Sequence, residues 1–256
     1  MKMESVSVLH FSPTGSTSDI AMYLGCKLSE RVVEFDLSKQ VLEGIDVGEK
    51  SLAVVAVPVY GGRVPRRAVE ALRFVSGNGA ACVSVAVFGN RAVDDALVEL
   101  NDVLTEQGFR VMASGEFVAQ HSLVAEVGAG RPDEGDFAAL GDFADGILKR
   151  VAAGDFSQVK DVPGNRDYAS QAVAPAAVTP MVLDSCLNCG MCARSCPVSA
   201  IPVGNCKETD AGKCMLCMRC VKTCPTRSRV LPAPFKEAVS ARLQAHRARR
   251  EPRVYL

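Results

Sequence analysis

The chain has 256 residues, and its 29 lysines and arginines balance its 29 aspartates and glutamates, so the formal net charge is zero. This balance gives no reason to expect nucleic-acid binding. The N-terminus lacks the cationic and apolar pattern of a signal peptide, and no apolar stretch approaches the ~20 residues of a membrane-spanning helix. We therefore expect a cytoplasmic protein without membrane insertion, and its length favours more than one domain.

Residues 1–153 alternate apolar runs with amphipathic segments. The apolar runs are nearly continuous in hydrophobicity, which is typical of strands covered on both faces of a parallel sheet. Strands are expected at residues 6–11, 31–35, 52–59, 81–88 and 109–119. Helical spacing is found at residues 17–30, 65–75, 91–107 and about 135–153. Strand and helix in alternation predict a doubly wound α/β domain.

The remaining residues divide into three further segments. Residues 154–183 hold three prolines and no apolar period, so we interpret them as a linker. Residues 184–230 are rich in cysteine and form the second expected domain. Residues 231–256 are expected to be a C-terminal helix, whose apolar side chains share one face, followed by a basic tail. Whether this helix packs on the protein or docks a partner stays open.

Nine of the eleven cysteines fall in the second domain, and in a reducing compartment such a cluster indicates metal binding. Two runs, CLNCGMCARSCP (186–197) and CMLCMRCVKTCP (214–225), share the spacing C-x2-C-x2-C-x3-C-P. Two zinc sites are the alternative, but zinc needs two pairs of ligands and does not account for a triplet plus a fourth cysteine before proline. Cys26 and Cys82 lie apart in apolar surroundings and are expected to be core residues.

The cysteine spacing resembles that of the bacterial dicluster ferredoxins over residues 184–230. In this spacing each triplet binds one [4Fe–4S] cluster, and the fourth cysteine reaches the other cluster. One cluster is then expected on Cys186, Cys189, Cys192 and Cys224. The second is expected on Cys214, Cys217, Cys220 and Cys196. Cys206 is surplus to these eight ligands and is interpreted as a packed or exposed thiol, with a labile ligand as the alternative.

A loop rich in hydroxyl groups, FSPTGST (11–17), follows the first expected strand and opens the first expected helix. A helix N-terminus offers unpaired amides and partial positive charge, so this loop can bind phosphate although it contains no lysine or arginine. It matches neither the Walker phosphate loop nor the dinucleotide fingerprint. Asp36, at the end of the second strand, is therefore interpreted as a turn residue rather than a ribose ligand.

The arrangement of Ser12, Thr14, Gly15 and Thr17 resembles flavodoxin, whose loop holds the phosphate of FMN. Flavodoxin strand order, 2-1-3-4-5, would bring two further loops to the same edge of the sheet, PVYGGRVP (58–65) and FGNRAVDD (88–95). Tyr60 can stack on a flavin ring. The residues expected to bind FMN are Ser12, Pro13, Thr14, Gly15, Ser16, Thr17, Pro58, Val59, Tyr60, Gly61, Gly62, Phe88, Gly89, Asn90, Arg91 and His121.

Over residues 5–230 the chain resembles the flavodoxin–ferredoxin fusion proteins of anaerobes. The resemblance implies a flavodoxin-like five-stranded parallel sheet followed by a small α+β ferredoxin-like domain. It also implies intramolecular electron transfer between two [4Fe–4S] clusters and FMN, with a redox partner protein or a small acceptor outside the chain. We expect no hydrolytic or group-transfer chemistry and no catalytic side chain. The alternatives are an FMN-dependent reductase of a small, quinone-like acceptor and a zinc-binding interaction protein.

Overall fold

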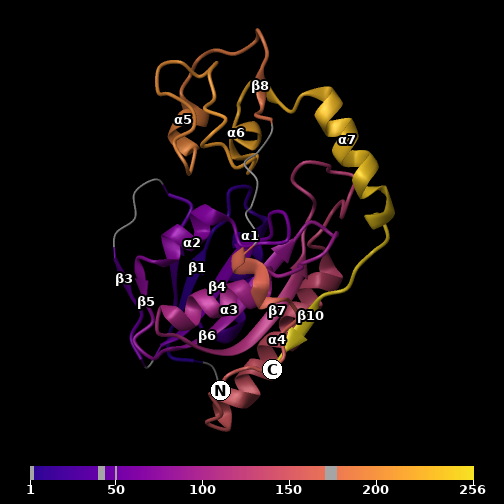
Figure 1. Cartoon of the computed structure of the whole chain (residues 1–256). Coiled ribbons are helices and arrows are strands. Elements are labelled where there is room, and N and C mark those ends of the chain that lie inside the picture. The colour runs from indigo at the N-terminus through magenta and orange to yellow at the C-terminus, as the bar shows by residue number, and fades with distance from the viewer. Residues whose placement is uncertain (1–2, 40–43, 50, 171–177) are drawn as a thin grey trace.

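The computed structural model of the chain describes residues 3–39, 44–49, 51–170 and 178–256. Five parallel strands form the centre of the sheet, in the spatial order β2-β1-β4-β6-β7 (Figure 1). Numbered along the main sheet alone, this order is the predicted 2-1-3-4-5, which is confirmed. The strands are β1 (Val6–His10), β2 (Val32–Asp36), β4 (Leu52–Pro58), β6 (Ala81–Phe88) and β7 (Arg110–Val118).

The two faces of the sheet carry separate apolar cores, because successive side chains of a strand point to opposite sides. On one face, residues such as Leu9 and Val55 pack against α2 (Arg66–Leu72) and α3 (Ala96–Glu106). On the other, Val8 and Val54 pack against α1 (Ser16–Leu28) and α4 (Glu134–Ala152). Every residue of β6 is buried, which is why its sequence shows no polar alternation.

The segment after α4, which is expected to be a linker, packs on the main domain where it is described. Val159 and Val162 pack on the core beside α3, and a short 3-10 helix, η1 (Arg166–Ser170), follows. The Tyr168 hydroxyl donates to Asp102 over 2.9 Å. Residues 171–177 of the predicted linker lie outside the described residues. A further small sheet joins β3 (Ile45–Asp46) to β5 (Val75–Ser76).

The cysteine-rich segment is a small α+β unit that lies beyond the carboxyl ends of the main strands (Figure 1). Its antiparallel pair joins β8 (Met181–Val182) to β9 (Arg229–Val230). Between these strands lie two short helices, α5 (Met191–Ser195) and α6 (Arg219–Lys222). Such short elements bury little apolar surface of their own, so the unit depends on other interactions for its stability.

The C-terminal residues return to the main sheet, which the sequence analysis did not anticipate. After α7 (Ala233–Leu243) and η2 (Gln244–His246), strand β10 (Arg253–Tyr255) pairs antiparallel with β7. The sheet therefore has six strands rather than the five expected. Leu243 of α7 is buried against Val124 and Val127, so this helix packs on the protein by its apolar face.

One expectation about the two isolated cysteines is wrong. Cys82 is fully buried in β6, but Cys26 is exposed. The buried face of α1 holds Ile20, Leu24 and Leu28, and Cys26 lies on the opposite side of the helix. The apolar residues beside Cys26 in the sequence therefore did not indicate that its side chain is exposed. Among the described residues, no helix combines the length and apolar character that crossing a membrane requires.

Candidate functional site

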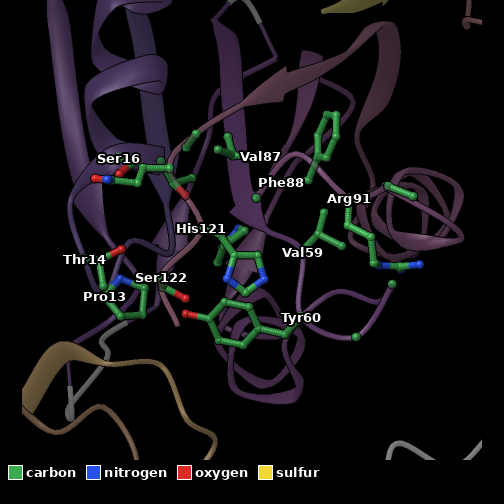
Figure 2. Close-up of a pocket in the computed structure, with 18 residues that line it drawn as sticks. Pro13, Thr14, Ser16, Val59, Tyr60, Val87, Phe88, Arg91, His121 and Ser122 are labelled. Carbon is green, nitrogen blue, oxygen red and sulfur yellow. The ribbon is translucent and has the colours of Figure 1, made fainter. Parts of the chain in front are cut away.

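A cleft opens at the carboxyl ends of β1, β4 and β6, where the loops that follow these strands converge (Figure 2). The cleft lies at the switch point of the doubly wound sheet, the usual ligand position in this architecture. Its lining residues are Pro13, Thr14, Ser16, Thr17, Pro58, Val59, Tyr60, Gly61, Gly62, Val87, Phe88, Gly89, Arg91, Ala92, Ala119, Gln120, His121 and Ser122.

The loop before α1 presents hydrogen-bond donors to this cleft. Gly15 stands at the N-cap with φ of 97°, a conformation that favours glycine, and makes no side-chain cap. The hydroxyl of Ser12 accepts from the Ser18 amide over 2.9 Å. Within the described residues, the amides of Ser16 and Thr17 have no hydrogen-bond acceptor. They are free to bind an anion at the helix N-terminus.

The loop before α1 contains no lysine or arginine, but a lysine from a distant part of the sequence lies beside it. Lys222, at the end of α6, donates from Nζ to the carbonyl oxygen of Thr14. The same Nζ lies 3.5 Å from the position that a Cβ on Gly15 would take. In the described part of the chain no carboxylate pairs with Lys222. The loop before α1, which is expected to bind phosphate, thus has a positive charge beside it, and the cysteine-rich segment provides that charge.

The second loop is held in shape by a buried ion pair beneath it. Tyr60 and Arg63 form an isolated antiparallel bridge that closes a tight turn. The guanidinium of Arg63 binds Glu99 through two hydrogen bonds, of 2.7 and 2.8 Å, and also donates to the Tyr168 carbonyl. Inside the turn, a Cβ on Gly62 would lie 2.4 Å from a carboxylate oxygen of Asp94. No larger residue fits there without displacing that side chain.

His121 projects into the cleft beside Tyr60 (Figure 2). Its Nδ1 accepts hydrogen bonds from the amides of Leu123 and Val124, at 3.2 and 3.3 Å, so the ring hydrogen lies on Nε2. Burial lowers the pKa of His121, and the charge of Arg91 lowers it further. The imidazole is therefore neutral near pH 7 and can donate from Nε2. Gly89 makes room for it, since a Cβ there would lie 2.6 Å from the ring.

The structure places most, but not all, of the expected FMN residues along the cleft. Ser12, Gly15 and Asn90 do not line it. Asn90 is buried, and its amide group donates to the carbonyls of His246 and Ala248, so it fastens the C-terminal segment instead. The sequence analysis missed five lining residues: Val87, Ala92, Ala119, Gln120 and Ser122. Most follow or end expected strands, so the strand-end rule could have found them.

The mouth of the cleft is also the boundary with the cysteine-rich segment. Burial raises the pKa of Tyr60 well above its ordinary value, Cys217 raises it further, and Arg219 lowers it. Arg219 lies 3.8 Å from the carboxylate of Asp36 and donates to the Ser38 hydroxyl. Met215 packs against the core beside α2 and α3. The second cysteine run is therefore held directly against the cleft.

A second, smaller cavity lies within the cysteine-rich segment. Its lining includes Cys214, Cys217 and Cys220 together with Cys196 from the first run. This is the set that crossed ligation predicts for one cluster, and the cavity favours that prediction without testing it. Burial raises the pKa of Cys217 to about 12 and that of Cys220 to about 11. Without a bound metal these thiols keep their protons.

Backbone amides also approach the sulfur atoms of the two fourth cysteines. The Ala200 amide lies 3.3 Å from Cys196 Sγ, and the Ser228 amide lies 3.2 Å from Cys224 Sγ. Amide–sulfur hydrogen bonds of this kind are among the contacts that tune iron–sulfur clusters. Among the described residues, no three His, Cys, Asp or Glu side chains are gathered around a single metal ion. Thiolates on one zinc ion stand within about 4 Å of each other, whereas those of a cubane bind separate irons.

Cys206 is a buried thiol. It is 1% exposed and contacts Cys192, and its amide donates to the side chain of Asn188 over 2.8 Å. This places a ninth thiol beside the first triplet. A role as an alternative ligand stays a prediction.

Comparison with known families identifies the cysteine-rich segment. Residues 181–201 and 211–227 match two family models, each described as a 4Fe-4S binding domain. No curated protein matches the chain in sequence. The segment is therefore an iron–sulfur module, as the cysteine spacing predicted.

Solved structures resemble the sheet-bearing part of the chain at low identity. Rubredoxin:oxygen oxidoreductase from the anaerobe Desulfovibrio gigas matches at 14% identity and a TM-score of 0.41, over 59% of this chain and 37% of its own. The flavodoxin of Streptococcus pneumoniae TIGR4 matches at 20% and 0.39, over 57% and 99%. A Fusobacterium nucleatum flavodoxin bound to flavin mononucleotide matches at 14% and 0.39, over 58% and 99%. The strand order of this chain defines its fold.

The chain therefore combines two parts. A doubly wound sheet in flavodoxin order carries a cleft at its switch point, and a 4Fe–4S binding module lies over that cleft. This is the arrangement that the resemblance to flavodoxin–ferredoxin fusions implies. A general role in electron-transfer oxidoreduction follows from the iron–sulfur module.

Proposed function

We propose that the chain binds FMN in the cleft and two [4Fe–4S] clusters in the cysteine-rich segment, and that it transfers electrons between them within one polypeptide. The observation that carries this proposal is the contact between the two parts. Lys222, Arg219 and Met215, all from the second cysteine run, touch the cleft loop, the end of β2 and the main core. The set of cysteines nearest the flavin site is therefore Cys214, Cys217, Cys220 and Cys196.

The residues present fit FMN at each part of the molecule. The free amides of the loop before α1, with Thr14, Thr17 and Lys222, suit the phosphate. Tyr60 suits a face of the ring, and the Nε2 of His121 suits a ring acceptor. When bound, FMN supplies one- and two-electron chemistry, and each cluster supplies one-electron chemistry. The chain's part is to bind these groups, to orient them and to keep them close together.

The proposed division of the chain follows from these contacts. Residues 1–153 form the FMN domain, residues 154–183 connect it to the iron–sulfur domain at 184–230, and residues 231–256 return to the sheet. Thiol-rich clusters of this kind belong in a reducing compartment, so we place the protein in the cytoplasm. The electron donor and acceptor outside the chain are a redox protein or a small molecule.

The proposal is tested first by composition. Protein purified without oxygen is expected to contain iron, acid-labile sulfide and FMN in stoichiometric amounts. The double variant Thr14→Val/Thr17→Val removes two hydroxyls at nearly constant volume, so it should lose FMN and keep its iron. Thr105→Val changes an exposed helical threonine and should keep both. FMN retained in the double variant would place the phosphate elsewhere.

Electron transfer within one chain has a kinetic signature. After rapid reduction of the clusters, the rate constant for flavin reduction should not change with protein concentration. A rate constant that rises in proportion to concentration would mean that electrons pass between molecules.

A second function is favoured by one observation, the donor orientation of His121 in an open cleft. A hydrogen-bond donor there could hold a carbonyl oxygen of a small acceptor against the flavin, as a quinone reductase requires. Steady-state turnover with small quinones decides between the two: rapid turnover that falls in His121→Phe supports a reductase. Turnover only with protein acceptors supports a carrier.

A further inference from the structure

Arg229 is a buried cation at the centre of the cysteine-rich segment. It begins β9, where it pairs with Val182 of β8, and it is 2% exposed. Arginine is almost never buried to this extent unless a partner compensates its charge. The identity of that partner is the question that the structure raises.

Neutral groups hold the ends of the guanidinium. Its Nη1 donates to the Thr209 hydroxyl over 2.9 Å, and its Nη2 donates to the carbonyls of Cys206 and Glu208. Its Nε–H is buried without a hydrogen-bond acceptor in the described part of the chain. Nor does any described carboxylate lie within 4 Å of it, although the same segment contains ion pairs elsewhere. Both a full charge and one donor are left uncompensated.

Two of the groups that hold the guanidinium lie against the cysteines. The carbonyl that accepts from Nη2 belongs to Cys206, whose side chain contacts Cys192 of the first triplet. The hydroxyl that accepts from Nη1 belongs to Thr209, which lines the second cavity together with Cys214 and Cys220 of the second triplet. Arg229 therefore lies beside both predicted cluster sites.

We propose that Arg229 is the internal counter-charge of the two clusters, and that its guanidinium raises their reduction potentials. The inference rests on the proposed iron–sulfur function. Four thiolate ligands outweigh the positive charge of a [4Fe–4S] core, so each loaded site is an anion. Each one-electron reduction adds one more negative charge. A buried cation beside the ligands favours the reduced state, because net charge and hydrogen bonds to sulfur set the potential. The uncompensated charge and the spare Nε–H then both have partners.

The test measures both cluster potentials in the full-length, loaded protein by redox titration followed by electron paramagnetic resonance. Arg229→Gln removes the charge, and the ratio of reduced to oxidised cluster at a fixed potential should fall about tenfold, which is 59 mV for one electron. Arg229→Lys keeps the charge and should lie between this variant and the wild type. Arg227→Gln is the matched control: it removes an exposed arginine two residues away and should leave both potentials unchanged.

Three results would overturn the proposal. One is unchanged potentials in Arg229→Gln at full iron content. Another is an equal shift in Arg227→Gln, which would indicate a general charge effect. If Arg229→Gln retains no clusters, the iron content of Arg229→Lys decides. Full iron content in Arg229→Lys supports a counter-charge. Loss of iron equal to that of Arg229→Gln shows that only the hydrogen bonds of the guanidinium matter. Wild-type protein without iron and sulfide would instead refute the proposed function.

Discussion

The clearest energetic prediction concerns the ion pair beneath the second cleft loop. The side chains of Arg63 and Glu99 are only 13% and 8% exposed, and two hydrogen bonds join them. Arg63→Met would leave the Glu99 carboxylate buried with one described donor, the Val64 amide at 2.9 Å. Breaking a buried pair by removing one partner costs about 3–5 kcal/mol. Because the Val64 amide remains, we expect a loss of about 3 kcal/mol in unfolding free energy.

The chain offers a matched control three residues away. Arg66 forms an ion pair of similar length with Glu70, at 2.8 Å, but its side chain is 92% exposed. Exposed pairs of this spacing contribute about 0.3–0.5 kcal/mol. Arg66→Met should therefore change stability by no more than about 0.5 kcal/mol. Both variants remove one guanidinium from the same part of the fold, and they differ in the burial of the pair and in the further hydrogen bond of Arg63 to the Tyr168 carbonyl.

Urea denaturation of the two variants, followed by circular dichroism, measures the difference. Arg63→Met should lower the midpoint strongly at a constant slope, whereas Arg66→Met should not move it. Because the pair supports the turn that carries Tyr60, Arg63→Met should also weaken FMN binding. Equal stabilities of the two variants would show that the buried pair contributes no more than a surface pair, and the reasoning would fail.

Three further predictions follow from other contacts. Lys222→Met should weaken FMN binding about two- to fivefold, as expected for an exposed charge pair. It should leave riboflavin binding unchanged, because riboflavin lacks the phosphate. Lys207→Met is the control and should change neither; an equal weakening of riboflavin binding in Lys222→Met would contradict the role of Lys222. Cys196→Ser should damage the cluster on the second triplet and spare the first, and Cys224→Ser should do the reverse; spectra showing the opposite selectivity would mean that each run closes its own site. Tyr255→Phe removes a hydroxyl that donates to buried Glu116 over 2.8 Å. The free energy of unfolding, measured by thermal denaturation, should fall by about 1–2 kcal/mol. An unchanged free energy would mean that this contact of β10 adds little to the stability of the sheet.

Features that depend on residues close together in the sequence could be predicted for this chain. The five parallel strands follow from apolar runs that alternate with helical segments, because a strand buried on both faces is apolar at nearly every position. Their order was implied by the resemblance to flavodoxin. The iron–sulfur module follows from cysteine spacing, because ligands to one cluster lie close together in sequence. The three loops of the cleft could be placed because parallel strands end at one edge.

Contacts between residues far apart in sequence could not be predicted in this way. Lys222 lies 208 positions beyond Thr14, and no local pattern connects them. The antiparallel strand β10 is only three residues long, so its composition resembles a basic tail until the edge of β7 pairs with it. The Asn90 side chain donates to the carbonyls of His246 and Ala248, and its place after a strand gives no sign of this contact with the returning C-terminal segment.

Arg229 is the clearest case of a residue whose role the local sequence does not reveal. In the sequence it is one arginine among several in a basic stretch near the last cysteine. Its burial, its missing carboxylate and its position between two sets of thiols arise only when β8 and β9 pair and the 206–209 segment closes over them. Local sequence fixes which residues can bind a metal, since ligand chemistry and spacing are local properties. The charge that surrounds those ligands depends on which distant side chains the fold buries beside them, and only the tertiary structure determines that.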